Sequence, residues 1–201
     1  MSSRQFIDLV KRVATLESRY LPEAEDILGD YSLDQQDDAR SCILLSHAEI
    51  EDYLEQMAEV LCADVQDRFN MKEFNDISIR FLYSAGKKDT ELRHPNSAAA
   101  ALNGFSALFK KSVVKNNNGI KEKDLRKLFD PFFDVDDLFG SELLAQVDYL
   151  GTKRGECAHK GFVGIRQTVN AFEVRSAIDC VIDGLFDFDT YILDAIYRKK
   201  G

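Results

Sequence analysis

The sequence lacks several features that mark common classes of protein. It contains no tryptophan, only three prolines among 201 residues, and no apolar run near the roughly 20 residues that a membrane-spanning helix needs. Its start, residues 1–8, ends on an acidic residue where a secretory signal is apolar. We therefore expect a cytoplasmic protein with no membrane partner. Because 45% of the residues are hydrophobic, the chain can bury enough apolar surface to exclude a disordered protein.

Cysteine, zinc-ligand and phosphate-loop patterns are also missing. The four cysteines form no C-x-x-C pair, and three of them fall in strongly apolar helical patterns, which indicates reduced core thiols: Cys42, Cys62 and Cys180. His47 with Glu51, and Cys157 with His159, give only two ligands each where zinc needs more. No glycine-rich loop is followed by lysine, and no G-x-S-x-G elbow occurs. The expected metal and cofactor content is none.

The charge is distributed unevenly along the chain. The net charge of −9 argues against a protein that coats nucleic acid by bulk attraction. Residues 1–70 and 128–201 carry −10 and −5, whereas residues 71–127 carry +6. The densest basic part surrounds a polar turn at 116–119 and contains Lys110, Lys111, Lys115, Lys121, Lys123, Arg126 and Lys127. It is either a solvated loop with flanking helix ends or a local patch that contacts phosphate.

Helical periodicity runs through most of the chain. It predicts a helix over 3–20 that continues past Pro22 toward Gly29, and a long helix over 37–69 capped by Asp34 or Asp37. Shorter helices are predicted over 98–114, capped by Ser97, and over 121–129. A helix beginning at Ser141 and a last long helix opened by Asn170 complete the set.

Two segments are less regular. Residues 73–84 fit either a strand or a helix, and we choose a short helix. Residues 132–139 form an apolar connector with acidic residues between the apolar ones, typical of a lid over a core. No repeat or linker interrupts the chain. The sequence therefore predicts an all-α fold, a single-domain helical bundle over 1–201 with long central helices.

Three histidines are available for chemistry. His47 lies on the apolar seam of the long helix and fits a core or interface role, and His94 lies in a polar loop. His159 lies within the segment 153–162, which has cations on both sides and glycines that loosen the helix. That composition suits an anion.

The spacing of Arg154 and His159 restricts how they act together. On a regular helix, five residues turn about 500°, which leaves the two positions about 140° apart around the axis. One straight helix does not bring both to a single phosphate. Either the helix ends between them, as Gly155 and Gly161 permit, or two copies of the segment face each other across a dimer axis.

Two segments carry a family resemblance. Residues 150–161, read LGTKRGECAHKG, resemble the Arg-x4-6-His motif of the HEPN superfamily, and residues 44–54, read LLSHAEIEDYL, resemble its long helix. The similarity is nearest to the RiboL-PSP-HEPN type, associated with RNase LS and prokaryotic defence. It covers roughly residues 3–199 by helix order, but only these two segments by motif.

This resemblance implies a metal-independent endoribonuclease, usually a homodimer and often a toxin or anti-phage defence effector. By position, Arg154 and His159 are the motif residues, and Glu51 or Asp52 matches an acidic position on the long helix. The family often has a polar residue directly after the arginine, where this chain has Gly155, so Glu156 is expected to take over that contact. The residues expected to bind the RNA substrate are Lys153, Lys160, Lys110 and Lys111.

Chemistry is consistent with this reading. Metal-free RNA cleavage needs a base for the 2′-hydroxyl, an acid for the leaving oxygen and positive charge near the phosphorane, and histidine with arginine supplies these. Two alternatives stay open: a catalytically inactive HEPN module for dimerisation or nucleotide binding, and a helical adaptor. An antitoxin or another defence-system protein is a further expected partner, because the acidic first 70 residues suit a basic surface.

Overall fold

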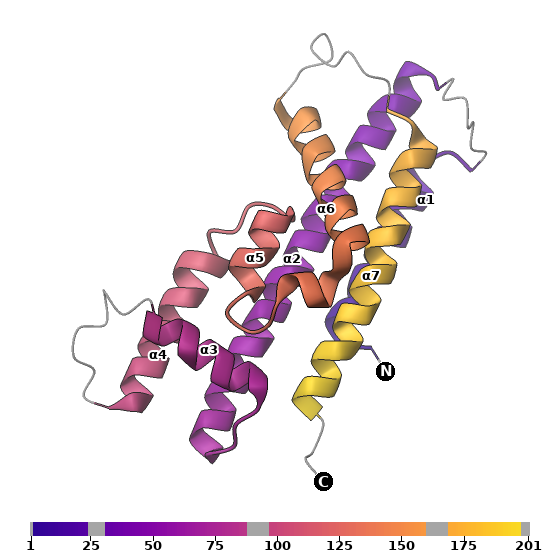
Figure 1. Ribbon diagram of the computed structural model, residues 1–201. Helices are drawn as coiled ribbons and strands as arrows, with labels where there is room; N and C mark the ends of the chain where they lie inside the picture. Colours follow the sequence, from indigo (N-terminus) through magenta and orange to yellow (C-terminus); the bar gives the residue numbers. More distant parts are fainter. Residues whose placement is uncertain (1, 24–30, 88–96, 160–168, 198–201) are drawn as a thin grey trace.

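The computed structural model describes residues 2–23, 31–87, 97–159 and 169–197 (Figure 1). Within these ranges the chain forms helices and no strand, which confirms the predicted all-α class. In chain order the elements are α1 (Arg4–Tyr20), α2 (Leu33–Met71), α3 (Asp76–Lys87), α4 (Ala98–Phe109), the π-helical turn η1 (Lys110–Val114), α5 (Glu122–Phe129), α6 (Val135–His159) and α7 (Ala171–Tyr197).

The first two helices begin and end at residues whose side chains and backbone explain the boundaries. α1 ends at Tyr20, because Leu21 is extended, so the predicted continuation past Pro22 is wrong. α2 begins after Ser32, whose hydroxyl accepts from the Gln35 N–H while the Gln35 side chain accepts from the Ser32 N–H. This capping box stands where Asp34 or Asp37 was predicted to cap the helix.

α2 is the central helix of the bundle. It contacts every other helix, and Figure 1 shows it running the length of the molecule behind α6 and α7. Its buried face follows the predicted seam, and the fully buried residues include Ile50, Leu54 and Leu61. Sequence-distant elements therefore meet along α2, with α1 and α7 toward one side and α3, α4 and α5 toward the other (Figure 1).

The α3–α5 side is held together by phenylalanines. Phe81 of α3 stacks on Phe132 at a centroid distance of 4.8 Å and meets Phe105 and Phe109 of α4 edge-on. This packing explains why residues 73–84 form a helix, since Phe81 and Ile77 face one core. The predicted helix over 98–114 begins after the Ser97 cap as expected but changes to a π-helical turn after Phe109.

The predicted connector becomes part of a helix. α6 begins at Val135, and it kinks at Gly140, whose φ of 66° and ψ of 162° suit glycine. Ser141, the predicted start of a helix, directly follows the kink. The apolar residues of this segment, including Phe132, Phe133 and Phe139, are buried in the core and do not form a separate lid.

α7 carries a buried carboxylate that fastens three parts of the chain. Asp189 has no exposed surface; its oxygens accept from the Ser3 N–H at 2.7 Å, from the Ser3 hydroxyl and from the Tyr53 hydroxyl at 3.1 Å. Asn170 caps α7 as predicted, accepting from the Phe172 N–H at 2.9 Å. The start of α1, the middle of α2 and the end of α7 are thus tied at one buried point.

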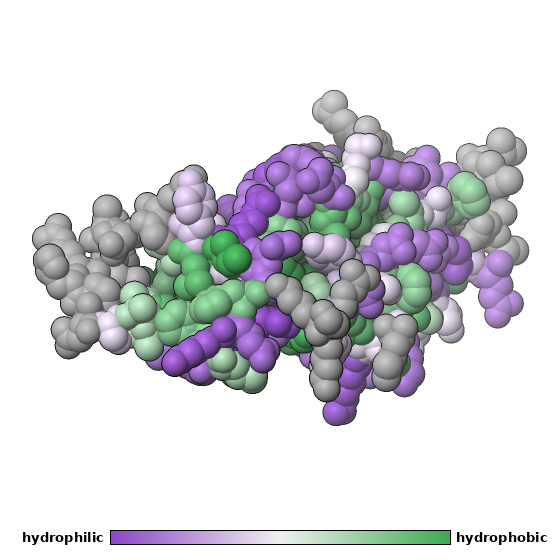
Figure 2. All heavy atoms as spheres, turned by 60° about the horizontal axis from the view of Figure 1, so that its bottom comes forward, coloured by the Kyte–Doolittle hydropathy of each residue, from purple (hydrophilic) through white to green (hydrophobic). Residues whose placement is uncertain are grey.

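The surface of the described residues has two notable properties. Their helices include none with the length and apolar character needed to cross a membrane. Figure 2 shows hydrophobic surface gathered toward the α3–α4 side of the end viewed there. The large exposed apolar side chains at the end of α2, in the turn after it and on α3 are Met71, Phe74, Ile79 and Tyr83.

Candidate functional site

α6 continues through the motif without a break. Gly140 is its only residue with non-helical backbone angles, so the helix passes Gly155 and reaches His159. Of the two alternatives left open by the sequence, a helix that ends between Arg154 and His159 is therefore excluded. The two positions lie about 140° apart around one helix axis. The remaining arrangement from the sequence, two facing copies, stays a prediction.

Arg154 is turned toward α2. Arg154 is half-buried, and its charge lowers the pKa values of both His47 and Glu51 on α2. Arg154 has no hydrogen bond or ion pair with any residue of the described ranges. Other arginines there use their donors on protein acceptors: Arg12 on Glu49, Arg68 on Asp64, and Arg126 on Glu122 and Asp136. Among the described residues, Arg154 thus has no acceptor for its donors.

Glu51 provides a half-buried carboxylate beside this guanidinium. Burial and the neighbouring Glu55 carboxylate raise the pKa of Glu51, and Arg154 partly offsets the rise. Asp52, the alternative left open by the sequence, is exposed and accepts from Gln56 at 2.6 Å. The structure therefore brings Glu51, and not Asp52, to the α6 face that carries Arg154.

His47 lies one helical turn before Glu51 and is buried, with 3% of its surface exposed. Its Nδ1 lies 3.6 Å from a Glu51 carboxylate oxygen. Burial, reinforced by the charges of Arg154 and Lys121, lowers the pKa of His47 to about 4, while Asp124 opposes the shift. His47 is therefore neutral near pH 7. The predicted core role of His47 fits its burial, and the polar neighbours add that it borders the site.

The first turn of α5 and the loop before it supply polar groups that were not predicted from the sequence. Asp124 is buried, with 3% exposed, and its charge raises the pKa values of His47 and Glu51. A Cβ atom on Gly119 would lie 2.5 Å from an Asp124 oxygen, so only glycine fits there. Asn117 donates to Glu55 at 3.1 Å. A buried acidic residue in a lysine-rich segment was the available signal.

Glu156 and Lys153 lie away from the α2-facing side of α6. The two-residue step from Arg154 to Glu156 turns about 200°, which places Glu156 nearly opposite. Glu156 lies 3.9 Å from the Lys153 ammonium, and that ammonium lies 5.6 Å from the Tyr149 ring centroid. The structure therefore does not bring Glu156 to Arg154 in place of the missing polar residue.

The other predicted residues fall elsewhere. Lys110 and Lys111 belong to η1, and the Lys110 charge acts on Cys62, eleven residues beyond Glu51 on α2. That separation is about 16 Å along the helix, so the pair lies apart from Arg154. The side chain of His159, and residues Lys160 and His94, lie outside the described part of the chain.

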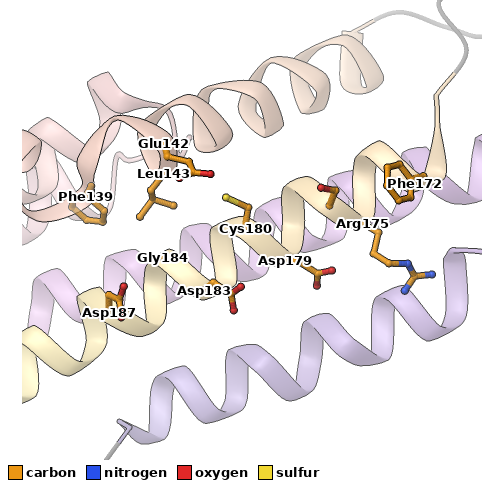
Figure 3. Close-up of a pocket in the computed structure, with 11 residues that line it drawn as sticks. Phe139, Glu142, Leu143, Phe172, Arg175, Asp179, Cys180, Asp183, Gly184 and Asp187 are labelled. Atoms are coloured by element: carbon orange, nitrogen blue, oxygen red, sulfur yellow. The ribbon is translucent and has the colours of Figure 1, made fainter. Parts of the chain in front are cut away.

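A groove between α6 and α7 presents a contrasting surface. It has a volume of about 710 Å³, and Figure 3 shows side chains from both helices lining it. Its carboxylates are Glu142, Asp179, Asp183 and Asp187. Burial, together with the charges of Glu142 and Asp183, raises the pKa of the Cys180 thiol in this groove. Such an anionic surface repels phosphate. The better anion site is the group of Arg154, His47, Glu51, Asp124 and Lys121, here called the Arg154 cluster.

Comparison with known families decides the affiliation. The family model of RiboL-PSP-HEPN matches residues 8–194, which spans α1 to α7. The chain belongs to the RiboL-PSP-HEPN family. Comparisons with curated proteins and with solved structures gave no match. Membership in the HEPN family supports an RNase-type or defence-related role, and the predicted family and fold are confirmed.

The site can be summarised in the terms of this HEPN fold. α2 supplies a carboxylate and a neutral imidazole, α5 supplies the buried Asp124 carboxylate, Lys121 directly before α5 supplies an ammonium, and α6 supplies a guanidinium. The described residues contain no group of three His, Cys, Asp or Glu side chains arranged to hold a metal ion. The arrangement can bind an anion and exchange a proton through Glu51, whose raised pKa moves it toward neutrality.

Proposed function

We propose that this single-domain HEPN protein is a metal-independent endoribonuclease that acts as a homodimer. Arg154 binds the scissile phosphate, His159 transfers protons at the 2′-hydroxyl or the leaving oxygen, and Glu51 adjusts the charge and proton supply beside Arg154. In a cell this activity suits a toxin or anti-phage effector, held in check by an antitoxin or another defence-system partner.

The observation that carries the proposal is the state of Arg154. It is half-buried beside Glu51 and His47, yet it makes no hydrogen bond or ion pair with the described residues. A guanidinium offers five N–H donors in a planar fork that matches phosphate oxygens. Held near a partly desolvated carboxylate, such a group suits an anion that the described part of the chain does not provide.

Helix geometry supports the proposed homodimer. Positions 154 and 159 lie about 140° apart on one continuous helix, so a single α6 does not direct both toward one phosphate. A twofold axis near α6 would bring Arg154 of one copy and His159 of the other to a shared cleft. Two histidines would then be available, one as base and one as acid.

The primary experiment measures RNA cleavage without metal. Purified protein is incubated with end-labelled RNA in EDTA and compared with His159→Ala and Arg154→Lys. We expect cleavage by the wild type, loss of about 10²-fold or more in both variants, and no cutting of DNA of the same sequence, which lacks the 2′-hydroxyl. The matched control is Arg12→Lys, because Arg12 lies on α1 and forms an ion pair with Glu49 of α2. If the wild type leaves several different RNA substrates uncleaved, the proposal is wrong.

The oligomeric state is measured separately by sedimentation velocity. A dimer over the concentration range of the cleavage assay supports a site shared between two copies. A strictly monomeric protein that still cleaves RNA would contradict the shared site, because one α6 would then have to suffice.

One observation favours the inactive HEPN module as a second candidate. Gly155 replaces the polar residue that the family often has after the arginine, and Glu156 does not reach that side of α6. For such a module, RNA or a nucleotide would bind with Arg154-dependent affinity and no cleavage would occur. The same wild-type and Arg154→Lys proteins, tested for binding by fluorescence anisotropy, separate the two functions.

A further inference from the structure

Lys121 at the start of α5 is held against α6 by two contacts. Its Nζ donates to the Thr152 hydroxyl at 2.9 Å. Its side-chain stem crosses Gly151 so closely that a Cβ atom there would lie 2.7 Å from the Lys121 Cγ. This lysine is therefore fixed in position, unlike a lysine extended freely into solvent.

The charge of Lys121 has no counterion among the described residues. Its hydrogen-bond partner is a neutral hydroxyl, and no ion pair joins it to a described carboxylate. The same charge lowers the pKa of His47, which places Lys121 in the field of the Arg154 cluster. Lys127, by contrast, forms an ion pair: its ammonium lies 3.1 Å from an Asp124 oxygen.

The Lys121 ammonium lies against the side of α6 that carries position 159. Steps of four, three and four residues keep positions 148, 152, 155 and 159 on one side of the helix. α5 lies on this side, because the Glu122 N–H donates to Asp148 at 2.8 Å and Lys121 donates to Thr152. Lys121 thus lies on the row that leads to position 159, about two turns away, whereas Arg154 faces α2.

We propose that Lys121 is an RNA-binding residue that contacts a phosphate next to the scissile one. The assignment rests on the proposed function, because it requires RNA at the α6 motif. An ammonium acts as a point charge with rotatable donors, which suits a backbone phosphate whatever the base sequence. Arg154 and Lys121 then bind successive phosphates on two sides of one helix.

Gly151 is the residue that makes this placement possible. With any side chain at position 151, the Lys121 stem has to move, and we expect this shift to break the hydrogen bond from its ammonium to Thr152. Gly155, one turn later on the same row, has open space where a Cβ atom would be added. The two glycines therefore form a matched pair that differs in its effect on Lys121.

The test uses Lys121→Gln, Lys121→Arg and the control Lys123→Gln, an exposed lysine two residues along α5. RNA affinity is measured by fluorescence anisotropy between 50 and 200 mM salt, conditions in which phosphate contacts dominate, with protein folding checked by circular dichroism. For Lys121→Gln we expect affinity about tenfold weaker, a salt slope smaller by about 1, a higher KM and an unchanged kcat. Lys121→Arg restores most of the affinity, and Lys123→Gln changes little.

The glycine pair supplies the second arm. Gly151→Ala should weaken RNA binding as Lys121→Gln does, Gly155→Ala should not, and Gly151→Ala should add nothing to Lys121→Gln. If the wild type binds RNA and Lys121→Gln and Lys123→Gln change the affinity to the same extent, the proposed role of Lys121 is overturned and the proposed function is not. A wild type that neither binds nor cleaves RNA would overturn the proposed function together with it.

Discussion

Arg154 on α6 lowers the pKa of Glu51 on α2, which burial and Glu55 raise. The two residues lie 103 positions apart in sequence, and the packing of α6 on α2 brings their charges together. A carboxylate whose pKa is raised by burial, and only partly lowered again by a nearby cation, binds a proton more readily than an ordinary carboxylate does, a property of groups that transfer protons. The acidic member of the proposed site is therefore Glu51.

Replacing Glu51 tests this role directly. We expect Glu51→Gln to lower kcat for RNA cleavage by about 10² to 10⁴, the range for loss of a proton-transfer group, while RNA binding stays within about twofold. Steady-state kinetics in EDTA give both values. Asp52→Asn, a change at the adjacent exposed carboxylate on another face of α2, serves as the control. Equal losses in the two variants would show that the charge of α2, and not the placement of Glu51, matters.

His47 should make the fold sensitive to acid. Its pKa is about 4 in the folded protein and 6.5 as the ordinary value, so below pH 6.5 the unfolded chain gains a proton that the folded chain does not. Stability is therefore lost as pH falls from about 6.5 to 4. We expect this residue to account for about 2 to 3 kcal/mol of the difference in unfolding free energy between pH 7.5 and pH 4.5.

Urea unfolding of the wild type and His47→Gln at these two pH values isolates that contribution. The variant loses stability at both pH values because a buried side chain is altered, but its loss on acidification should be smaller than in the wild type. Glu51, with its raised pKa, acts in the opposite direction in both proteins. The same dependence on pH in the two proteins would contradict the assigned pKa of His47.

Helix positions were predictable from the sequence because most helices are amphipathic and have local caps. Ser97 and Asn170 cap their helices as expected. The failures have local causes that periodicity does not report. The extended backbone of Leu21 ends α1 early, and the glycine conformation at Gly140 joins the predicted connector to the next helix.

The site was predictable only in part, since tertiary contacts decide it. The motif residue Arg154 and the acidic Glu51 could be found from spacing and resemblance. Asp124 and Lys121 could not be placed from the sequence. A charged residue in a basic segment is expected to be exposed to solvent, and only the packing of α5 on α6 shows otherwise. Glu156 was given a role beside Arg154 that the helical phase does not support.

Asp189 should be a main contributor to stability. Its carboxylate accepts from the Ser3 N–H and hydroxyl and from the Tyr53 hydroxyl, and it has no exposed surface. An asparagine at position 189 places an N–H donor where a carboxylate oxygen accepts, so it faces the donors of Ser3 and Tyr53 without forming a hydrogen bond. We expect Asp189→Asn to lower the unfolding free energy by about 2 to 4 kcal/mol, measured by urea unfolding at pH 7.5. The control Asp187→Asn changes an exposed residue two positions earlier on α7 and should alter the unfolding free energy by no more than about 0.5 kcal/mol. An equal loss in both variants would show that the hydrogen bonds of Asp189 do not stabilise the fold.

Two glycines of α6 should respond in opposite directions to the same substitution. Gly140 has a φ of 66° at the kink, so Gly140→Ala forces an L-residue into a conformation that costs about 1 to 3 kcal/mol. Gly155 lies within regular helix with open space beyond its Cα, so Gly155→Ala should stabilise by about 0.5 to 1 kcal/mol, because alanine loses less backbone entropy on folding. Thermal unfolding of both variants beside the wild type measures the signs. If Gly140→Ala were neutral, the connector and α6 would not need the kink, and the core contacts of Phe139 would have to form with another backbone path.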